Sequence, residues 1–288
     1  MQNNFFLSAT WKQILKQSFG AESIDYIVAE EKLIISKFKK SLLTIAYPNF
    51  PIGIKSLEAA KIMTSDLSFL KKVNVSAQRL IIQHEDFDEG KSIPAQIKKQ
   101  PMSLIQDLQG WSIDNLTSSI RRNIRKSKKN KIEIRAISNI HEADSIFNLY
   151  VQTVKRHSGK VRYNREYFIQ LVNAILCESD ITGYVALHGN GELIGYMISA
   201  YQNEVAYYLH GGIDYKYQKY RVMDALFAQS IVTAKDLGLL NFNFLTSPPN
   251  QPDLVRYKEK WGAKTQIIHT VTFTKSKLAN KLLSLHNK

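Results

Sequence analysis

Residues 183–213, GYVALHGNGELIGYMISAYQNEVAYYLHGGI, decide the fold of this chain. Apolar and aromatic side chains fill three runs, and short polar stretches separate the runs from one another. Runs of this kind predict strands, and the glycines at 188–191 favour a tight hairpin turn between the first two. The stretch therefore predicts three consecutive antiparallel strands.

Helices and further strands flank this predicted meander. The apolar spacing alternates in the segments expected to be strands and recurs every three to four residues in those expected to be helices. Asn164 caps one helix, Gly238 ends another, and Pro252 lies in the first turn of a third. In chain order the prediction is strand 131–137, helix 140–157, a helix from Asn164, the three strands, helix 218–237, strand 241–245, helix 251–261 and strand 265–274.

The first 112 residues look like a shortened version of the same plan. Ser8 is expected to cap a short helix, and helix 56–70 carries a single apolar stripe. Residues 87–110 contain charges and two prolines with little periodicity, which is typical of a junction. Two domains are therefore predicted, 1–112 and 113–288. The extended runs of the first domain are 25–29, 32–38, 41–48 and 79–85.

The overall charge points to anionic partners. The chain of 288 residues carries a formal net charge of +14, and residues 121–131, RRNIRKSKKNK, hold seven of these cations and no carboxylate. Such a surplus favours binding to tRNA, CoA phosphates or an anionic membrane surface. Many basic proteins have no such partner, so a merely solvated charge stays open.

The compartment is inferred from absences in the sequence. Cys177 is the single cysteine, which excludes an internal disulfide and fits a reducing environment. Its apolar surroundings predict a core position rather than a nucleophile. We also see no signal peptide and no apolar run of the roughly 20 residues that span a bilayer. We expect a cytoplasmic protein without an integral membrane segment.

Four segments, in the right order on the right predicted elements, resemble a known superfamily. They are SSIRRNIRKSKK (118–129), YVQTVKRHSGKVRYNREYF (150–168), residues 206–245 from AYYLHGGIDYKYQKYRVMDALF onward, and YKEKWGA (257–263). Together they resemble the GNAT acyltransferases, and more narrowly the FemAB-like branch. YKEKWGA is close to the branch's Lys-x-x-aromatic-Gly signature before the final strand.

The resemblance implies a fold and an activity. The implied fold is a mixed α/β sheet in two tandem GNAT-like halves, of which the C-terminal half is complete. The implied activity is N-acyl or aminoacyl transfer to an amine, such as an amino sugar or peptide of a cell-surface polymer or its precursor. The acceptor would be a small molecule or lipid-linked, and the donor would be acyl-CoA (acetyl-CoA) or aminoacyl-tRNA.

One feature departs from the ordinary GNAT pattern. Those enzymes place a glycine-rich turn before the helix that binds the CoA pyrophosphate, so that bare backbone N–H groups meet the phosphates. Here residues 218–223 read QKYRVM without a glycine. The predicted donor contacts are therefore side chains, and CoA itself is in question. The candidates are Lys219, Tyr220 and Arg221, together with Arg125 of the basic segment.

Three residues are candidates for direct catalysis. Lys258 matches the family lysine that stabilises charge at the reacting centre, although a solvated lysine is the plain alternative. His210 is expected to titrate near neutrality and to share a strand face with Tyr208, which suits a general base. A structural histidine is equally compatible with its position. Asp214 either accepts a proton or caps a turn.

The acceptor is expected to contact the connection between the first two helices of the second domain. In the GNAT plan this connection borders the acceptor cleft, although loops are polar in any case. The predicted substrate-binding residues are Arg156, His157, Tyr163, Tyr208 and Tyr257.

Two alternatives remain at this point. The basic segment 121–131 is either a solvated helix face or a surface that attracts phosphates, including those of an anionic membrane. The whole chain is either an acyltransferase or a non-catalytic tRNA-, RNA- or anion-binding protein on the same scaffold. No metal site is predicted, because the seven histidines show no paired ligand spacing.

Overall fold

The structure is a computed structural model and describes residues 4–65, 68–84, 87, 96–189 and 191–286. Backbone contacts divide the chain into two compact units. The first unit comprises Met1–Phe5, Ser103–Thr246 and Gln251–Thr265, and the second comprises Phe6–Met102, Ser247–Asn250 and Gln266–Lys288. The division falls inside strands β5 (Gln96–Ile105) and β11 (Lys264–Thr274). The prediction of two related halves that meet after residue 112 stays a prediction.

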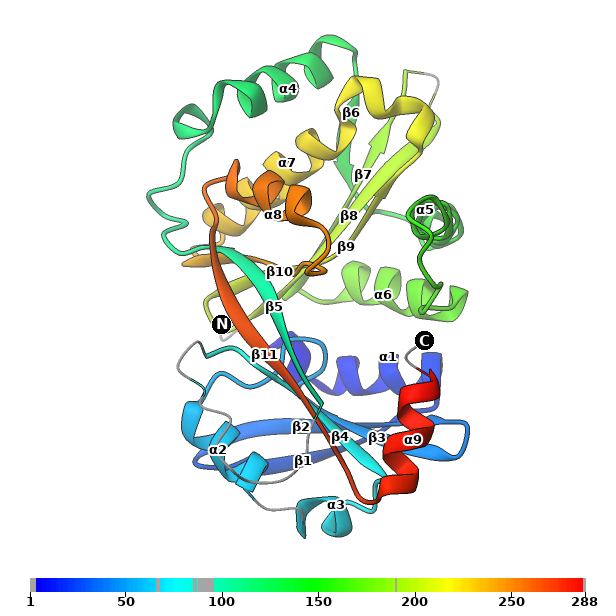
Figure 1. The fold of residues 1–288 in the computed structure, drawn as a ribbon. Coiled ribbons are helices and arrows are strands. Elements are labelled where there is room, and N and C mark those ends of the chain that lie inside the picture. The colour runs from blue at the N-terminus through cyan, green and yellow to red at the C-terminus, as the bar shows by residue number, and fades with distance from the viewer. Residues whose placement is uncertain (1–3, 66–67, 85–86, 88–95, 190, 287–288) are drawn as a thin grey trace. The chain divides into compact units, whose positions relative to one another are not determined.

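The first unit has a mixed sheet with helices on both faces. Its strands follow the order β10-β9-β8-β7-β6, with β9 and β10 parallel and the other pairs antiparallel. Figure 1 shows α4, α7 and α8 on one side of this sheet and α5 and α6 on the other. Parallel and antiparallel pairs in one sheet confirm the predicted mixed α/β class. Its elements are η2 (Ile113–Asn115), α4 (Ser118–Lys129), β6 (Glu133–Ala136), α5 (Glu142–Arg156), α6 (Arg165–Cys177), β7 (Ile181–Leu187), β8 (Leu193–Gln202), β9 (Val205–Ile213), η3 (Tyr215–Tyr220), α7 (Val222–Asp236), β10 (Asn241–Thr246) and α8 (Pro252–Glu259).

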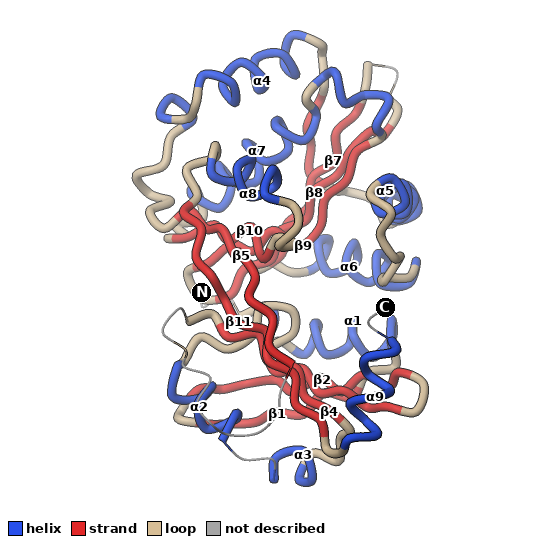
Figure 2. The backbone as a smooth tube through the Cα atoms, viewed as in Figure 1, coloured by secondary structure: helices blue, strands red, loops and turns tan. Residues whose placement is uncertain are grey.

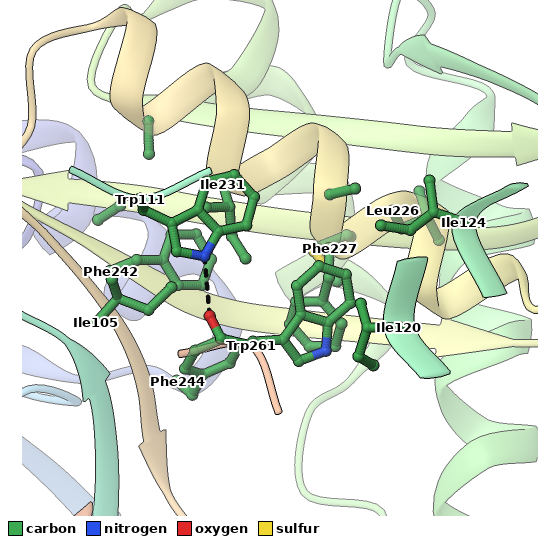
Figure 3. Close-up of a cluster of buried hydrophobic side chains, with 14 of the residues drawn as sticks. Ile105, Trp111, Ile120, Ile124, Leu226, Phe227, Ile231, Phe242, Phe244 and Trp261 are labelled. Atoms are coloured by element: carbon green, nitrogen blue, oxygen red, sulfur yellow. Dashed lines mark hydrogen bonds between the residues drawn. The ribbon is translucent and has the colours of Figure 1, made fainter. Parts of the chain in front are cut away.

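The core of the first unit fixes α4 and α7 to the sheet. Ile120 and Ile124 of α4 lie against the buried side chains of α7, and Figure 3 shows them beside Leu226 and Phe227. The Trp111 indole donates a 2.9 Å hydrogen bond to the backbone oxygen of Trp261. The loop before α4 and the end of α8 are thereby tied together inside an apolar cluster.

The strands of the second unit follow the order β1-β2-β3-β4-β11. Side chains of β3 alternate between two clusters: Ala46 packs with α2 and α3, whereas Leu43 and Ile45 pack with α9. Figure 2 shows the helices of this unit in blue around its red strands. Its elements include η1 (Phe5–Leu7, at the unit boundary), α1 (Ala9–Phe19), β1 (Glu22–Val28), β2 (Glu31–Lys40), β3 (Leu43–Pro48), α2 (Leu57–Ser65), α3 (Ser68–Lys72), β4 (Ala77–Ile82) and α9 (Lys277–His286).

Several local predictions are confirmed at the atomic level. The Ser8 side chain accepts from the backbone N–H of Trp11 at 3.0 Å, and the Asn164 side chain accepts from that of Tyr167 at 2.9 Å. Gly238 follows α7 with a φ of +78°, a conformation that favours glycine. Pro252 begins α8.

Other predictions were wrong. Residues 96–105 of the presumed junction form strand β5, while most of the rest of 87–110 that precedes it lies outside the described residues. Cys177 is exposed because it is the last residue of α6, beyond the buried stripe. The helix predicted at 218–237 is broken at Arg221, where a left-handed residue separates η3 from α7.

Candidate active site

β9 and β10 run side by side for only a short distance. The parallel register joins Asn241–Asn243 to Val205–Tyr207. Beyond these three pairs β9 continues to Ile213 and β10 to Thr246. Within these described strands the ladder does not extend further. Backbone groups of β9 that face this side are therefore available to other partners.

A β-bulge lies in β9 at the point where the strands part. In the pairing with β8, Ser199 is opposite Tyr208 and Ile198 is opposite His210, so Leu209 is the extra residue. A bulge places two residues against one and shifts the alternation of side chains. The prediction that Tyr208 and His210 share a face was therefore wrong.

The bulge separates the surroundings of these two residues. The Tyr208 ring lies 5.0 Å from that of Phe227 on α7, and burial raises the pKa of the Tyr208 hydroxyl to about 12. The His210 ring instead lies among α6-side aromatics, 4.7 Å from Tyr163 and 5.4 Å from Phe168. Tyr208 and His210 thus lie on opposite faces of the sheet.

His210 is buried and neutral. Its Nε2 forms a 3.0 Å hydrogen bond with the hydroxyl of Tyr167. Burial lowers the pKa of His210 to about 3, because the charged imidazolium would lose its hydration in this apolar position. The expectation that it titrates near neutrality was therefore wrong. Its role as a general base stays a prediction. At this pKa the buried imidazole accepts a proton much less readily than a free imidazole does.

Lys258 is buried, which excludes the interpretation as a solvated lysine. Its side chain is 4% exposed, and its Nζ donates to the backbone oxygens of Phe244 at 2.9 Å, Leu245 at 3.0 Å and Thr246 at 3.5 Å. Burial lowers the pKa of Lys258 from 10.5 to about 7. The lysine therefore holds the end of β10, where this strand has parted from β9.

The carbonyls that Lys258 holds belong to an irregular piece of backbone. Leu245 has a φ of +57°, a left-handed conformation that is costly for a branched side chain. The Asn243 side chain accepts from the Leu245 N–H at 2.8 Å. Lys258 and Asn243 together stabilise a turn of the chain that an ordinary strand would not make.

The start of α7 contains a buried carboxylate that the sequence reading missed. Asp224 is 5% exposed and lies in the first turn of α7. The Tyr257 hydroxyl donates to its Oδ1 at 3.1 Å, and Asn123 of α4 and Arg221 also stabilise the charged form. Burial is the larger effect and raises the pKa of Asp224. A lone carboxylate among the apolar residues VMDALF was the signal for it in the sequence.

The start of α7 does not fit the pyrophosphate of CoA. Arg221 caps α7 in a left-handed conformation (φ 62°, ψ 37°) without a side-chain hydrogen bond to the helix. A carboxylate in the first turn already uses the favourable end of the helix dipole and repels further negative charge. Residues 218–224 contain no glycine, so each carries a side chain beside the backbone that would meet the phosphates.

Three of the five predicted substrate-binding residues lie on and after α5, whereas Tyr208 lies on β9 and Tyr257 on α8. The Arg156 guanidinium stacks 4.8 Å over the ring of Tyr215 and lies within hydrogen-bond distance of the His157 ring. Tyr163 stacks on Tyr167 at 4.6 Å. Tyr163 is thereby brought next to His210, whereas Arg156 and His157 lie at the exposed end of α5.

Asp214 caps η3. Its side chain accepts from the backbone N–H of Lys216 at 3.0 Å and forms a 3.3 Å ion pair with the Lys216 ammonium. The same ammonium contacts Glu192 at 2.7 Å. These bonds agree with the alternative that Asp214 caps a turn, and its catalytic role stays a prediction.

The predicted donor contacts lie on η3 and α4. The Tyr220 ring stacks against His188, with 5.7 Å between centroids, and Lys219 lies 5.1 Å over the same ring. Lys219, Arg221 and Arg125 are exposed. Their roles stay predictions. Nowhere in the described ranges do three or more His, Cys, Asp or Glu side chains gather as metal ligands would.

Comparisons with known proteins bear on the family. The acetyltransferase (GNAT) domain matches residues 115–259 of this chain. A search of curated proteins finds no match. No helix among the described residues is long and apolar enough to cross a membrane.

Solved structures with little sequence identity share the fold. FemX has a TM-score of 0.61 at 12% identity, over 91% of this chain and 90% of its own. L-PGS from Bacillus licheniformis has a TM-score of 0.63 at 13% identity, over 98% and 96%. A C-terminal domain from Agrobacterium fabrum, assigned to a lysylphosphatidylglycerol synthetase, has a TM-score of 0.59 at 12% identity, over 96% and 90%.

The domain match covers half of the chain, and the likeness to FemX confirms the FemAB-like form of the fold. The parted β9 and β10, the bulge in β9 and the lysine of the signature helix lie within or at the edge of the matched residues. The chain belongs to the GNAT acetyltransferase family and is an acyltransferase.

Proposed function

We propose that this acyltransferase takes an aminoacyl group from aminoacyl-tRNA, and not an acyl group from acyl-CoA, and transfers it to an amine. The acceptor is an amino sugar or peptide of a cell-surface polymer or its precursor, either small or lipid-linked. The buried Asp224 carboxylate in the first turn of α7 carries this choice of donor.

Electrostatics support the choice of donor. A pyrophosphate at the start of α7 would be repelled by the Asp224 carboxylate. This carboxylate is held in place by a 3.1 Å hydrogen bond from the Tyr257 hydroxyl. An aminoacyl ester brings no pyrophosphate to this place, and its α-ammonium is a cation. One structural neighbour is named a lysylphosphatidylglycerol synthetase, and the lysyl group in that name is an aminoacyl group.

The reaction needs little chemistry from side chains. The neutral acceptor amine attacks the ester carbonyl carbon, and the carbonyl oxygen gains negative charge in the tetrahedral intermediate. The carbon–oxygen bond to the ribose then breaks, the amide forms, and the proton lost by the amine ends on the ribose oxygen. Positioning and backbone hydrogen bonds to the developing oxyanion account for most of the acceleration in such sites.

In this proposal the protein contributes three features. β9 N–H groups beyond Tyr207 face the carbonyl oxygen where the strands part. Lys258 fixes the β10 wall through three backbone oxygens and, in its protonated form, adds positive charge near the oxyanion. The connection that contains Arg156, His157 and Tyr163 contacts the acceptor. The transfer reaction takes place in the cytoplasm, where aminoacyl-tRNA is made.

A donor competition tests the proposal. The purified protein is given a panel of amino sugars and peptides with either ¹⁴C-aminoacyl-tRNA or ¹⁴C-acetyl-CoA, and amide products are identified by mass spectrometry. We expect label in an amide only from aminoacyl-tRNA, and no thermal shift with CoA. Lys258→Ala should abolish product formation, while Lys260→Ala on the same helix end should not.

Transfer from acetyl-CoA at a rate comparable with that from aminoacyl-tRNA would refute the choice of donor. Binding of tRNA without any turnover on the acceptor panel, and with no effect of Lys258→Ala, would favour the non-catalytic alternative.

A further inference from the structure

The basic segment of α4 has an outward face that the transfer reaction itself does not use. We propose that four cations on this face bind the phosphate backbone of the donor RNA. We call Arg122, Arg125, Lys126 and Lys129 the α4 stripe. The inference rests on the proposed function, because it assigns a place to the RNA of the aminoacyl donor.

The fold holds the stripe rigidly outward. At 100° per residue the four stripe positions lie within one narrow sector of α4, opposite Ile120, Ile124 and Ser127. These three are buried, with exposures of 1%, 5% and 1%. Figure 3 shows Ile120 and Ile124 directed into the core beside α7. The cations therefore need no folding step before they meet a ligand.

The charges of the stripe have no carboxylate partner among the described residues. All four side chains are exposed, and none forms an ion pair with a carboxylate of the described residues. The sequence between Asp114 and Glu133 contains no acidic residue. Like charges set this close repel one another, so a polyanion that neutralises them gains affinity.

The dimensions fit a nucleic-acid backbone. Arg122 and Lys129 are seven positions apart, so the stripe extends over about 10 Å at 1.5 Å per residue. One strand of a helix presents a phosphate about every 3.4 Å of its axis, so about three phosphates fall along the stripe. Exposed Lys219 and Arg221 continue the charge onto η3, which α4 contacts.

The burial of α4 favours RNA over a membrane surface. A helix that binds a bilayer inserts an apolar face between the lipids. The apolar face of α4 already packs inside the first unit. Among the described residues, no large hydrophobic side chain of α4 is exposed. The exposed face of α4 can therefore bind phosphates by electrostatic contact but, over residues 118–129, has no apolar side chains to insert into a bilayer.

Binding of uncharged tRNA, measured by fluorescence anisotropy from 50 to 250 mM KCl, tests the inference without any chemistry. Each lost phosphate contact reduces the slope of log K against log salt by about 0.7 to 0.9. We expect R122Q/R125Q/K129Q to lose about two units of slope and, near 0.1 M salt, affinity on the order of a hundredfold. R122K/R125K/K129R keeps the charge and should bind like the wild type.

A matched control removes three exposed lysines of the second unit. K61Q/K71Q/K99Q should leave tRNA affinity unchanged, although the net charge falls equally. Equal tRNA binding by R122Q/R125Q/K129Q and the wild type would overturn the inference while leaving the transferase proposal intact. So would a loss confined to binding of phosphatidylglycerol vesicles, which would assign the stripe to a membrane.

Discussion

Replacing Lys258 by methionine tests how the buried ammonium is held. Methionine keeps the straight side chain in the packed site but removes the charge and all three donors to the β10 carbonyls. The pKa of Lys258 falls from 10.5 to about 7 on folding. Between these two values the unfolded chain binds a proton that the folded chain does not, so wild-type stability rises with pH in this window.

The size of this effect follows from the shift. Each pH unit inside the window is worth about 1.4 kcal/mol. Between pH 6 and pH 9 the wild type should gain about 2.7 kcal/mol relative to Lys258→Met, because only the last two of these three units lie above a pKa of 7. The lost carbonyl bonds lower the stability of the variant by an amount that changes little with pH, so they leave this difference intact.

Urea unfolding at pH 6, 7, 8 and 9, followed by tryptophan fluorescence and circular dichroism, measures the difference. All other groups titrate equally in both proteins, so the difference isolates position 258. Lys260→Met is the control for loss of a lysine, because Lys260 is exposed at the end of the same helix. A stability difference for Lys258→Met that does not change with pH would contradict this prediction, since it would show an ammonium with ordinary solvation.

Three further predictions concern β8 and β9. The buried Tyr196 hydroxyl has no hydrogen-bond partner within the described ranges, so Tyr196→Phe should raise the free energy of unfolding by about 1 kcal/mol, and a lower stability in urea unfolding would reveal a partner. A Cβ at Gly212 would lie 2.9 Å from Thr153 Oγ1, so Gly212→Ala should cost about 1 to 3 kcal/mol, whereas Gly189→Ala meets open space and should cost less than about 0.5 kcal/mol. In NMR titration the imidazole of His210 should stay neutral down to about pH 4, and an inflection near pH 6.5 would contradict its burial.

Local patterns in the sequence predicted most elements correctly. The caps at Ser8 and Asn164 and the glycine after α7 are decided by residues within a few positions of one another, so a linear reading finds them. β5 escaped because Lys98, Lys99 and Pro101 interrupt its apolar alternation.

The site depends on longer-range packing and was harder to predict. The bulge at Leu209 has no marker in the sequence, yet it reverses the faces of the two residues that were expected to act together. Lys258 lies among charged neighbours and looks solvated, but the carbonyls that bury it come from β10. The buried position of Asp224 depends on hydrogen bonds from Tyr257 and Asn123, which lie on other helices and far from it in the sequence.

The most direct measurement is a crystal structure with a hydrolysis-resistant donor analogue, in which an amide joins the aminoacyl group to a 3′-adenosine. We expect the carbonyl oxygen of the analogue to accept a hydrogen bond from a β9 backbone N–H between Tyr208 and Ile213, beside the end of β10 that Lys258 holds. An analogue bound elsewhere, with β9 and β10 paired along their full length, would show that the site lies in another part of the protein.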